Sequence, residues 1–373
     1  MNLSGMVWRN LARRPARSLL TATGIGLAIA FAVSTIGVTQ GFRKTFVDGY
    51  ASLGTHMIVS KVSRDSPLPK PFDQSIGESI AEMPHVEAVS GMYWDLMSIE
   101  GAASRVVFGW ERESFRWKFL PITSGRIVPD RPDVAYVGIL AAAALGKKPG
   151  DTMEIESRQF LVAGIFEKNS PIDNSAVILP LDAMQDILDQ PGKINFLNIR
   201  LRPETTSREF ELLRTKIQSR FRGLRACRAD ELFSESLGAQ AAMAMSIGVT
   251  FFALCIGTLG VMNSVLMSVT ERKSEIGLLM AVGWGRRRVL RMILAESLFL
   301  SLLGAVGGVL TAIPGVYLLA NFGPLSGKIV GDFPVPLIVA AIAGATLFGL
   351  IGGIIPALRA VSPAPSTALR HEI

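Results

Sequence analysis

The segment TERKSEIGLLMAVGWGRRRVLRMILAESLFLSLL, residues 270–303, decides the architecture of this chain. After its charged first part, Ile276, Leu279, Met280 and Val282 follow at roughly helical spacing, which gives one apolar stripe beside a charged one. Gly283 is expected to end this helix, because glycine readily adopts the left-handed conformation at a helix C-terminus. We therefore expect a short amphipathic helix on the membrane surface, joined to a membrane-spanning helix. An ordinary basic loop between two spans is the alternative.

Four stretches of the chain contain almost no charged residues over lengths that suffice to cross a bilayer, which takes about 20 apolar residues. The chain has 373 residues, 49% of them hydrophobic, and its mean hydropathy of +0.38 is too high for a typical soluble protein. The expected spans are residues 18–42, 236–270 (with an outer extension), 291–320 and 334–358. The first is expected to be a retained anchor rather than a cleaved signal peptide, because its apolar run continues beyond a cleavage-like Ala28-Ile29-Ala30.

The remaining segments complete the expected fold class, a membrane protein with four transmembrane α-helices and a large α+β extracytoplasmic domain between helices 1 and 2. They are an amphipathic cytoplasmic segment (1–17), the extracytoplasmic domain (43–235), a cytoplasmic helix and loop (271–290), a short outer loop (321–333) and a cytoplasmic tail (359–373).

Basic residues are concentrated on one side of the predicted spans. The loop between the second and third spans, up to Arg291, carries six Lys or Arg residues and two glutamates, whereas the next loop has only Lys328 and Asp332. This positive-inside pattern places both termini and residues 271–290 in the cytoplasm, in a multi-pass protein of the bacterial cytoplasmic (inner) membrane. The formal net charge of +7 is thereby explained by topology, and no nucleic-acid partner is expected.

Residues 43–235 alternate strand-like and helix-like patterns, as in an α+β domain large enough for its own core. Two capping boxes, Ser75-x-x-Glu78 and Thr206-x-x-Glu209, each predict the start of a helix. Further helices are expected over 139–145 and 181–188, and strands over 56–62, 86–99, 105–109, 134–137, 152–156, 160–166, 177–179 and 194–201.

Seven aromatic residues lie close together in the middle of this outer segment. They are Tyr93, Trp94, Phe108, Trp110, Phe115, Trp117 and Phe119. The favoured interpretation is that they form part of the domain core. The alternative is an apolar surface for a ligand, a lipid or a partner protein.

The sequence contains no recognisable catalytic or metal-binding constellation. Its three histidines, His56, His85 and His371, are far apart, and no nucleophile elbow of the G-x-S-x-G type is present. The segment 323–328 is one residue short of a Walker pattern and is expected outside the cell. We therefore expect no enzyme activity and no catalytic, metal-binding or cofactor-binding residues. Any ATP is expected to bind a separate partner subunit.

Glu296 is an ionisable residue just inside the predicted third span. Such residues are functional candidates by default, because a charge in the membrane is costly. Here the position near the headgroup level favours a structural ion pair with Arg291, or with Arg288. A proton-carrying role is the alternative.

Several motifs run through the chain. The cytoplasmic one is ERKSEIG (271–277), followed by Glu296; the last span ends in IPALRA (355–360). WRNL (8–11) stands near the start, and FLVAG (160–164) lies in the outer segment. Together these motifs resemble the MacB/FtsX family of ABC transporter permeases, of the four-helix, mechanotransmission type, over nearly the whole chain.

The resemblance implies a homo- or heterodimer of permeases that works with a separate cytoplasmic ABC ATPase. In this family the helix after the second span is the coupling helix, here about residues 272–282, with Ile276, Leu279 and Met280 docking into a groove on the ATPase. The residues expected to couple to the ATPase are Arg272, Glu275, Ile276, Gly277, Leu279, Met280 and Gly283.

Our primary functional hypothesis is therefore a permease subunit that converts ATP hydrolysis by its partner into movements of the outer domain. Such movements would drive export or extraction of a peptide, lipid, lipoprotein or small toxic compound. The expected partners are the ATPase, a second permease copy, a periplasmic adaptor or chaperone, and membrane lipids. The alternative is a membrane-anchored receptor or scaffold, whose outer domain binds a ligand or regulates a cell-wall enzyme.

Overall fold

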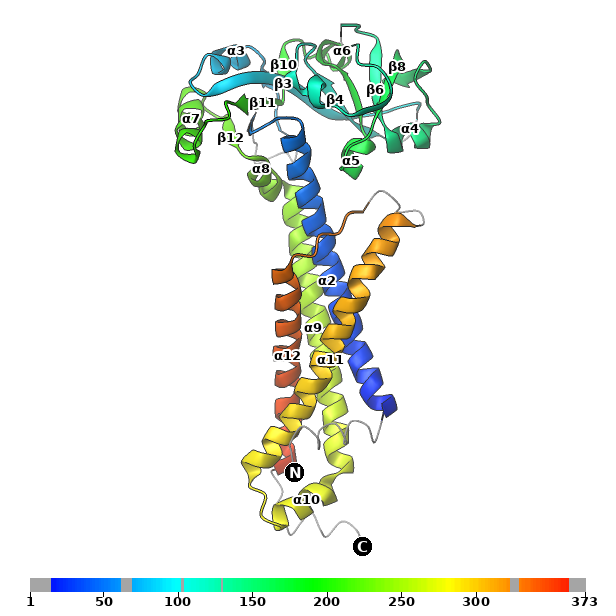
Figure 1. The fold of residues 1–373 in the computed structure, drawn as a ribbon, viewed down its shortest axis with the longest axis vertical. Helices are drawn as coiled ribbons and strands as arrows, with labels where there is room; N and C mark the ends of the chain where they lie inside the picture. The colour runs from blue at the N-terminus through cyan, green and yellow to red at the C-terminus, as the bar shows by residue number, and fades with distance from the viewer. Residues whose placement is uncertain (1–14, 62–68, 102–103, 129, 323–328, 362–373) are drawn as a thin grey trace. The chain divides into compact units, whose positions relative to one another are not determined.

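The computed structural model describes residues 15–61, 69–101, 104–128, 130–322 and 329–361 (Figure 1). They form two compact units: a membrane unit within Met1–Gly41 and Ala242–Ile373, and an outer unit, Phe42–Ala241. The chain crosses between the units twice, within helices α2 (Pro15–Ser52) and α9 (Leu237–Glu271). Residues 1–14 of the predicted amphipathic segment 1–17, which include the WRNL motif, and the tail from residue 362 lie outside the described residues.

Within the described residues, four helices are long and apolar enough to cross a membrane. They are α2, α9, α11 (Arg286–Asn321) and α12 (Val335–Val361), so the predicted class of a four-helix membrane protein is confirmed. Helix α2 continues to Ser52, beyond the expected end at residue 42. The reason is that Arg43 and Lys44 end the apolar run without ending the helix, since hydropathy marks the membrane boundary and not the hydrogen-bonding pattern.

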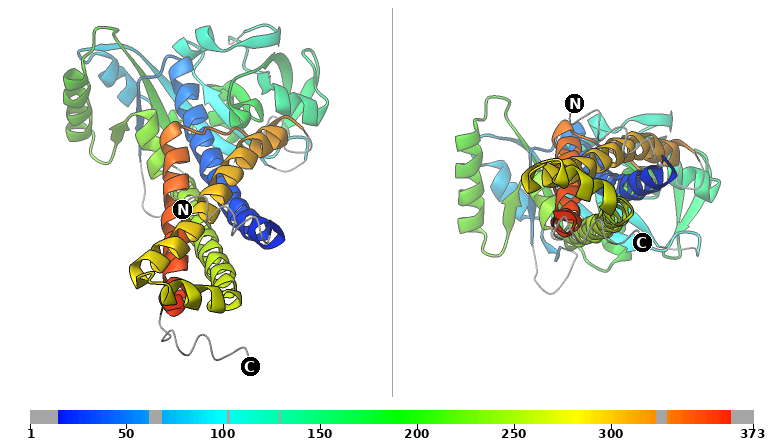
Figure 2. Two further views of the ribbon diagram at one scale, coloured as in Figure 1. Left: turned by 60° about the horizontal axis from the view of Figure 1, so that its bottom comes forward. Right: turned by 90° about the horizontal axis from the view of Figure 1, so that it is seen from below.

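Small residues allow the membrane helices to approach closely. A Cβ atom on Gly308 of α11 would lie 2.5 Å from the carbonyl oxygen of Gly26 in α2, and one on Gly304 would lie 2.7 Å from Cβ of Ile25. On the side of α11 toward α12, Gly349 lies directly against Ser301. Figure 2 shows α11 passing close to both α2 and α12. Because lipid offers helices no hydrophobic drive to associate, this close packing holds the unit together.

We predict that Gly308→Ala destabilises the membrane unit by about 1–3 kcal/mol, because the added methyl group overpacks the contact with α2. Gly307→Ala is the matched control, since a Cβ atom at this neighbouring position meets nothing within 4 Å and alanine favours a helix. Thermal unfolding of the purified protein in detergent measures the stability of both variants. Equal unfolding temperatures for the two variants would contradict the packing described.

The outer unit contains, within its described residues, a ten-stranded mixed sheet in the order β12-β1-β11-β3-β4-β9-β6-β8-β5, with β7 paired to β8. The pairs β4–β9 and β6–β8 are parallel and the other pairs antiparallel. The strands are β1 (Met57–Ser60), β3 (Val86–Met97), β4 (Arg105–Trp110), β5 (Ile122–Gly125), β6 (Val134–Gly138), β7 (Thr152–Ile155), β8 (Arg158–Phe166), β9 (Val177–Pro180), β11 (Phe196–Leu201) and β12 (Arg225–Cys227). A separate pair joins β2 (Phe72–Asp73) and β10 (Lys193–Ile194).

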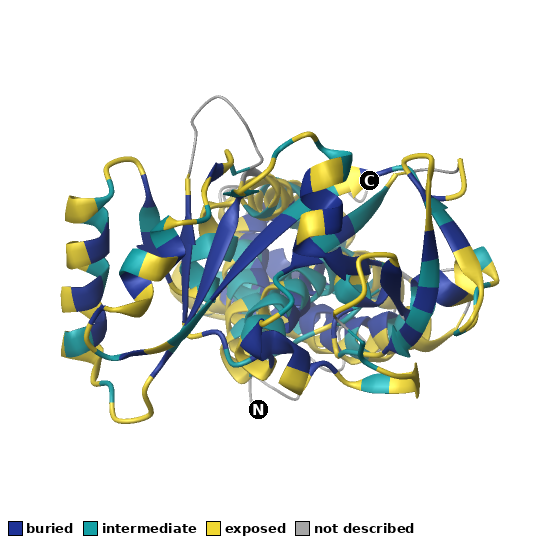
Figure 3. Ribbon diagram, turned by 90° about the horizontal axis from the view of Figure 1, so that it is seen from above, coloured by how far each residue is buried: buried dark blue, intermediate teal, exposed yellow. Residues whose placement is uncertain are grey.

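The two faces of the sheet carry separate apolar cores. Successive residues of β6 alternate between them, with Ala135 and Val137 in one core and Val134 and Tyr136 in the other, as strand geometry requires. Helices α3 (Ile76–Ala81), α4 (Ile139–Leu145), α6 (Leu181–Ile187) and α7 (Ser207–Arg220) contribute to the first core. Figure 3 shows the buried strands, and α7 with its buried residues facing inward and exposed residues outward.

The second core collects most of the aromatic cluster. Trp110 and Trp117 are buried, with ring centroids 4.9 Å apart, and Trp117 lies at the same centroid distance from Tyr136. Trp117 belongs to the short helix η1 (Phe115–Phe119), and Leu53, near the end of α2, is part of the same core. The favoured interpretation of these tryptophans as core is therefore confirmed. Other aromatic residues of the cluster line a cavity, described below.

The two predicted capping boxes have different outcomes. At the start of α7 the Thr206 hydroxyl accepts from the Glu209 amide, and the Glu209 carboxylate accepts from the Thr206 amide, so this capping box is confirmed. At Ser75 the predicted helix start is confirmed, since α3 begins at Ile76, but the capping box is wrong, because Ser75 has a helical conformation and makes no side-chain cap. Its amide and hydroxyl instead donate to Asp73, two residues earlier.

Candidate functional site

The short helix α10 (Lys273–Ala281) connects α9 to α11 within the membrane unit (Figure 2). It follows Arg272 and ends where Gly283 adopts a φ of +98°. This left-handed turn is the helix end that the sequence predicted. The Trp284 amide donates to the Leu279 carbonyl at 3.0 Å, which closes the turn before α11 begins at Arg286.

Helix α10 has one apolar side packed into its own chain. Ile276 is only 3% exposed and belongs to the same core as Val289, Met292 and Ile293 of α11. Met280 is partly buried against this core, and Gly277 is buried. The Ile276 side chain therefore holds α10 against α11, whereas Leu279 and Met280 are half-buried. The expected docking of these three residues into a groove on an ATPase stays a prediction.

The exposed apolar side of α10 is a different one. Leu278 is 58% exposed and Val282 is 75% exposed, one turn apart on the helix. Sequence reasoning missed Leu278 and assigned Val282 to the same stripe as Ile276, because α10 carries apolar residues on both sides and periodicity alone cannot tell which stripe is buried. The only available signal was the position of Leu278 opposite Ile276 on the helix.

Exposed basic residues surround this apolar pair. Lys273 precedes it, and Arg286, Arg287 and Arg288 follow at the start of α11. The Arg288 guanidinium lies over the Trp284 ring, 5.4 Å from its centroid. The surface formed by Leu278, Val282 and these cations suits a partner with an apolar groove bordered by acidic groups.

An ion pair joins the start of α10 to α11. Nη1 of Arg272 lies 3.1 Å from Oε1 of Glu296, whose side chain is 7% exposed, and Nε of Arg272 lies 3.1 Å from Oε2 of Glu275. The structure thus corrects the predicted partner of Glu296, which is Arg272 and not Arg291. Positions 291 and 296 lie five residues apart, so they do not share a face of α11, and Arg291 is exposed.

We predict that Glu296→Gln lowers the stability of the protein by about 1–3 kcal/mol, because it leaves the part-buried Arg272 guanidinium without a charged partner on α11. Thermal unfolding in detergent measures the loss. Arg291→Gln is the control, and it should leave the unfolding temperature unchanged. If Arg291→Gln lowered the unfolding temperature as much as Glu296→Gln, Arg291 and not Arg272 would be the partner of Glu296.

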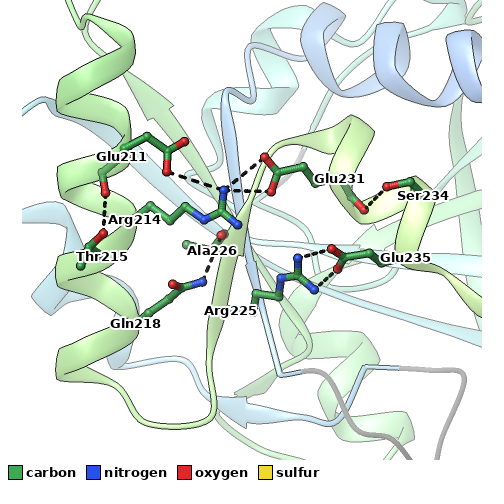
Figure 4. Close-up of polar contacts among 9 residues, drawn as sticks. All are labelled: Glu211, Arg214, Thr215, Gln218, Arg225, Ala226, Glu231, Ser234 and Glu235. Carbon is green, nitrogen blue, oxygen red and sulfur yellow. Dashed lines mark hydrogen bonds and ion pairs between the residues drawn. The ribbon is translucent and has the colours of Figure 1, made fainter.

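In the outer unit, two arginine–carboxylate pairs hold α8 (Ala229–Glu235), the last element before α9 (Figure 4). Arg214 of α7 lies 3.1 Å from Oε2 of Glu231, and Arg225 of β12 pairs with Glu235 through both of its terminal nitrogens. These side chains are 22–40% exposed, so each pair contributes only about 0–1 kcal/mol. Their effect is to orient α8 against β12 and α7.

No group of three or more His, Cys, Asp or Glu residues is arranged to hold a metal ion in the part of the chain that the structure describes.

Comparison with known families identifies the class of protein. The model of the MacB-like periplasmic core domain matches residues 18–212, and that of the FtsX-like permease C-terminal domain matches residues 247–365. The chain therefore belongs to the MacB/FtsX family of ABC transporter permeases, as its motifs predicted. It is a multi-pass membrane protein, and permeases of this family work with ABC ATPases.

Individual relatives cover the chain over almost its full length. It is 25% identical to the uncharacterized ABC transporter permease MJ1507 of Methanocaldococcus jannaschii, over 98% of this chain and 96% of that protein. It is 26% identical to the macrolide export ATP-binding/permease protein MacB of Agrobacterium fabrum, and 24% identical to the pyoverdine export ATP-binding/permease protein PvdT of Pseudomonas syringae pv. tomato. The chain spans 58% of the length of each of these two relatives.

Two solved structures resemble part of the chain. The periplasmic region of MacB from Actinobacillus actinomycetemcomitans is 14% identical, with a TM-score of 0.40, over 50% of this chain and 95% of that one. The extracellular domain of the noncanonic ABC-type transporter YknZ from Gram-positive bacteria is 9% identical, with a TM-score of 0.37, over 46% of this chain and 99% of that one.

Proposed function

We propose that this chain is the permease subunit of an ABC exporter in which a separate cytoplasmic ATPase acts on α10 and thereby moves the outer unit. The observation that carries this proposal is the two-sided construction of α10. One side is fixed to α11 by Ile276 and by the Arg272–Glu296 pair, and the other presents Leu278 and Val282. A helix built in this way can receive a push on its exposed side and pass it to α11.

The orientation is part of the proposal. The basic residues around α10 favour a cytoplasmic location by the positive-inside rule, and a cytoplasmic location is where an ATPase binds. The same topology would place the outer unit across the membrane. We further propose that a second permease copy completes the transporter, and that a periplasmic adaptor or chaperone contacts the outer unit.

The names of two relatives favour export over lipoprotein extraction, since they describe a macrolide exporter and a pyoverdine exporter. We therefore propose that the substrate is a small or peptide-like compound delivered to the outer side.

We predict that Leu278→Asp lowers co-purification of the partner ATPase by at least about tenfold, because a charge replaces an apolar contact at the docking surface. Membrane insertion should be unchanged, because Leu278 is exposed. Co-purification from the native membrane, followed by measurement of ATPase activity in the complex, checks both points.

Leu212→Asp is the matched control, since Leu212 is 63% exposed on α7 of the outer unit and lies far from α10 in sequence. It should leave ATPase recovery unchanged. Normal ATPase recovery with Leu278→Asp would contradict the docking surface. Complete absence of an ATPase from the wild-type complex would favour the receptor or scaffold alternative.

A further inference from the structure

The outer unit contains a cavity of about 600 Å³ on the side of its second core. That volume falls within the range of about 300–1,000 Å³ typical of small-molecule sites. Its walls are largely apolar and come from the end of α2, from β3, β4, β8, β9 and β11, and from α5 (Pro171–Asn174) and α8. Trp94, Val106, Phe108, Phe166, Ile178 and Phe196 are among the lining residues.

Two residues of the aromatic cluster, Trp94 and Phe108, are not fully buried in the core. Trp94 and Phe108 are half-buried and line the cavity, and the Trp94 ring stacks on Phe196 with centroids 6.5 Å apart. An apolar surface for a ligand was the alternative interpretation of these aromatics. Trp110 is buried and lines the cavity together with Trp94 and Phe108, whereas Trp117 is buried and does not line it.

A buried cation lines this apolar cavity. Arg116 is only 4% exposed, its Nε atom has no hydrogen-bond partner, and its Nη1 donates to the thioether sulfur of Met92, at 2.8 Å. The guanidinium lies 4.3 Å from the centroid of the Trp110 ring. No carboxylate among the described residues forms an ion pair with Arg116. Burial lowers the pKa of Arg116 to about 10, so it remains charged at neutral pH.

The other charged groups at the cavity balance one another. The Lys168 ammonium, 8% exposed, pairs with Asp173, and Arg225 pairs with Glu235. Burial also lowers the pKa of Lys168, while Asp173 opposes this shift. The lining side chains therefore carry one net positive charge. We assign it to Arg116, because Asp173, which also attracts Arg116, is in direct contact with Lys168. A buried guanidinium without a charged partner is costly, and a bound anion would offset that cost.

We propose that this cavity binds a single-chain amphiphile with one negative charge, its acyl chain against the aromatic wall and its anionic group on Arg116. A neutral apolar ligand would leave the guanidinium unpaired, and a small hydrophilic anion would leave the apolar walls empty. The carboxylate of a fatty acid and the phosphodiester of a lysophospholipid share the required chemistry. This site is argued from the outer unit alone and does not depend on the proposed coupling to an ATPase.

The test uses the full chain in phosphatidylcholine nanodiscs, without ATP, and a photoactivatable analogue of palmitate. We expect saturable labelling of peptides from β3, β4 and the end of α2. Unlabelled palmitate should compete, and hexadecanol, which has the same chain but no charge, should compete at least about tenfold less well. Stronger competition by lysophosphatidylglycerol than by palmitate would indicate the phosphodiester source, and weaker competition the carboxylate source.

Variants test whether Arg116 supplies the positive charge that binds the anionic group. Arg116→Gln should weaken labelling at least about tenfold, whereas Arg116→Lys should retain most of it. Lys118→Gln is the matched control, because Lys118 lies two residues away, is exposed and does not line the cavity. Val106→Trp narrows the cavity without touching the charge, and it should abolish labelling even if the Arg116 variants fold poorly.

Several results would overturn the proposal. These are labelling confined to the membrane helices, competition by hexadecanol as strong as that by palmitate, or unchanged labelling of a folded Val106→Trp variant. Because the readout needs no nucleotide, failure here is distinguishable from failure of the proposed ATPase coupling.

Discussion

The pairing of Arg272 with Glu296 is the constraint on which the membrane unit depends. Glu296 is buried within α11, and a carboxylate in that position is tolerated only with a partner. One partner, Arg272, stands directly before α10, so this ion pair joins α10 to α11. Ile276 adds an apolar contact at the same junction. The close glycine contacts at Gly308 and Gly349 then connect α11 to α2 and α12.

Both ends of the outer unit are fixed by contacts within it, at the end of α2 and directly before α9. Leu53, near the end of α2, packs into the second core, and α8, directly before α9, is held by Arg214 and Arg225. The chain leaves and re-enters the membrane unit through these two helices. We propose that force received at α10 reaches the outer unit along this route. The cavity beside Leu53 lies on the same side of the sheet, where its ligand would contact residues at the end of α2.

Sequence reasoning predicted the fold well where one physical signal dominated. The four spans follow from apolar length, and α4 and the start of α7 follow from composition and a capping box. It failed where two arrangements satisfy the same pattern. Helix α10 is apolar on two sides, so only tertiary packing shows that Ile276 is buried and Leu278 exposed. The partner of Glu296 and the unpaired state of Arg116 likewise depend on residues distant in sequence. The short elements β5, β12 and α8 have too few residues for a periodic signal.

The most direct test of the account measures whether the junction at α10 transmits movement. Spin labels at positions 212 and 310, in a background with Cys227 and Cys255 replaced by serine, report the distance between an exposed site of the outer unit and one of α11. In the complex with the ATPase, ATP and vanadate should shift this distance in the otherwise wild-type protein. In the Glu296→Gln variant, ATP and vanadate should leave the distance between the spin labels unchanged, although this variant still binds the ATPase. An identical shift in both proteins would contradict the account.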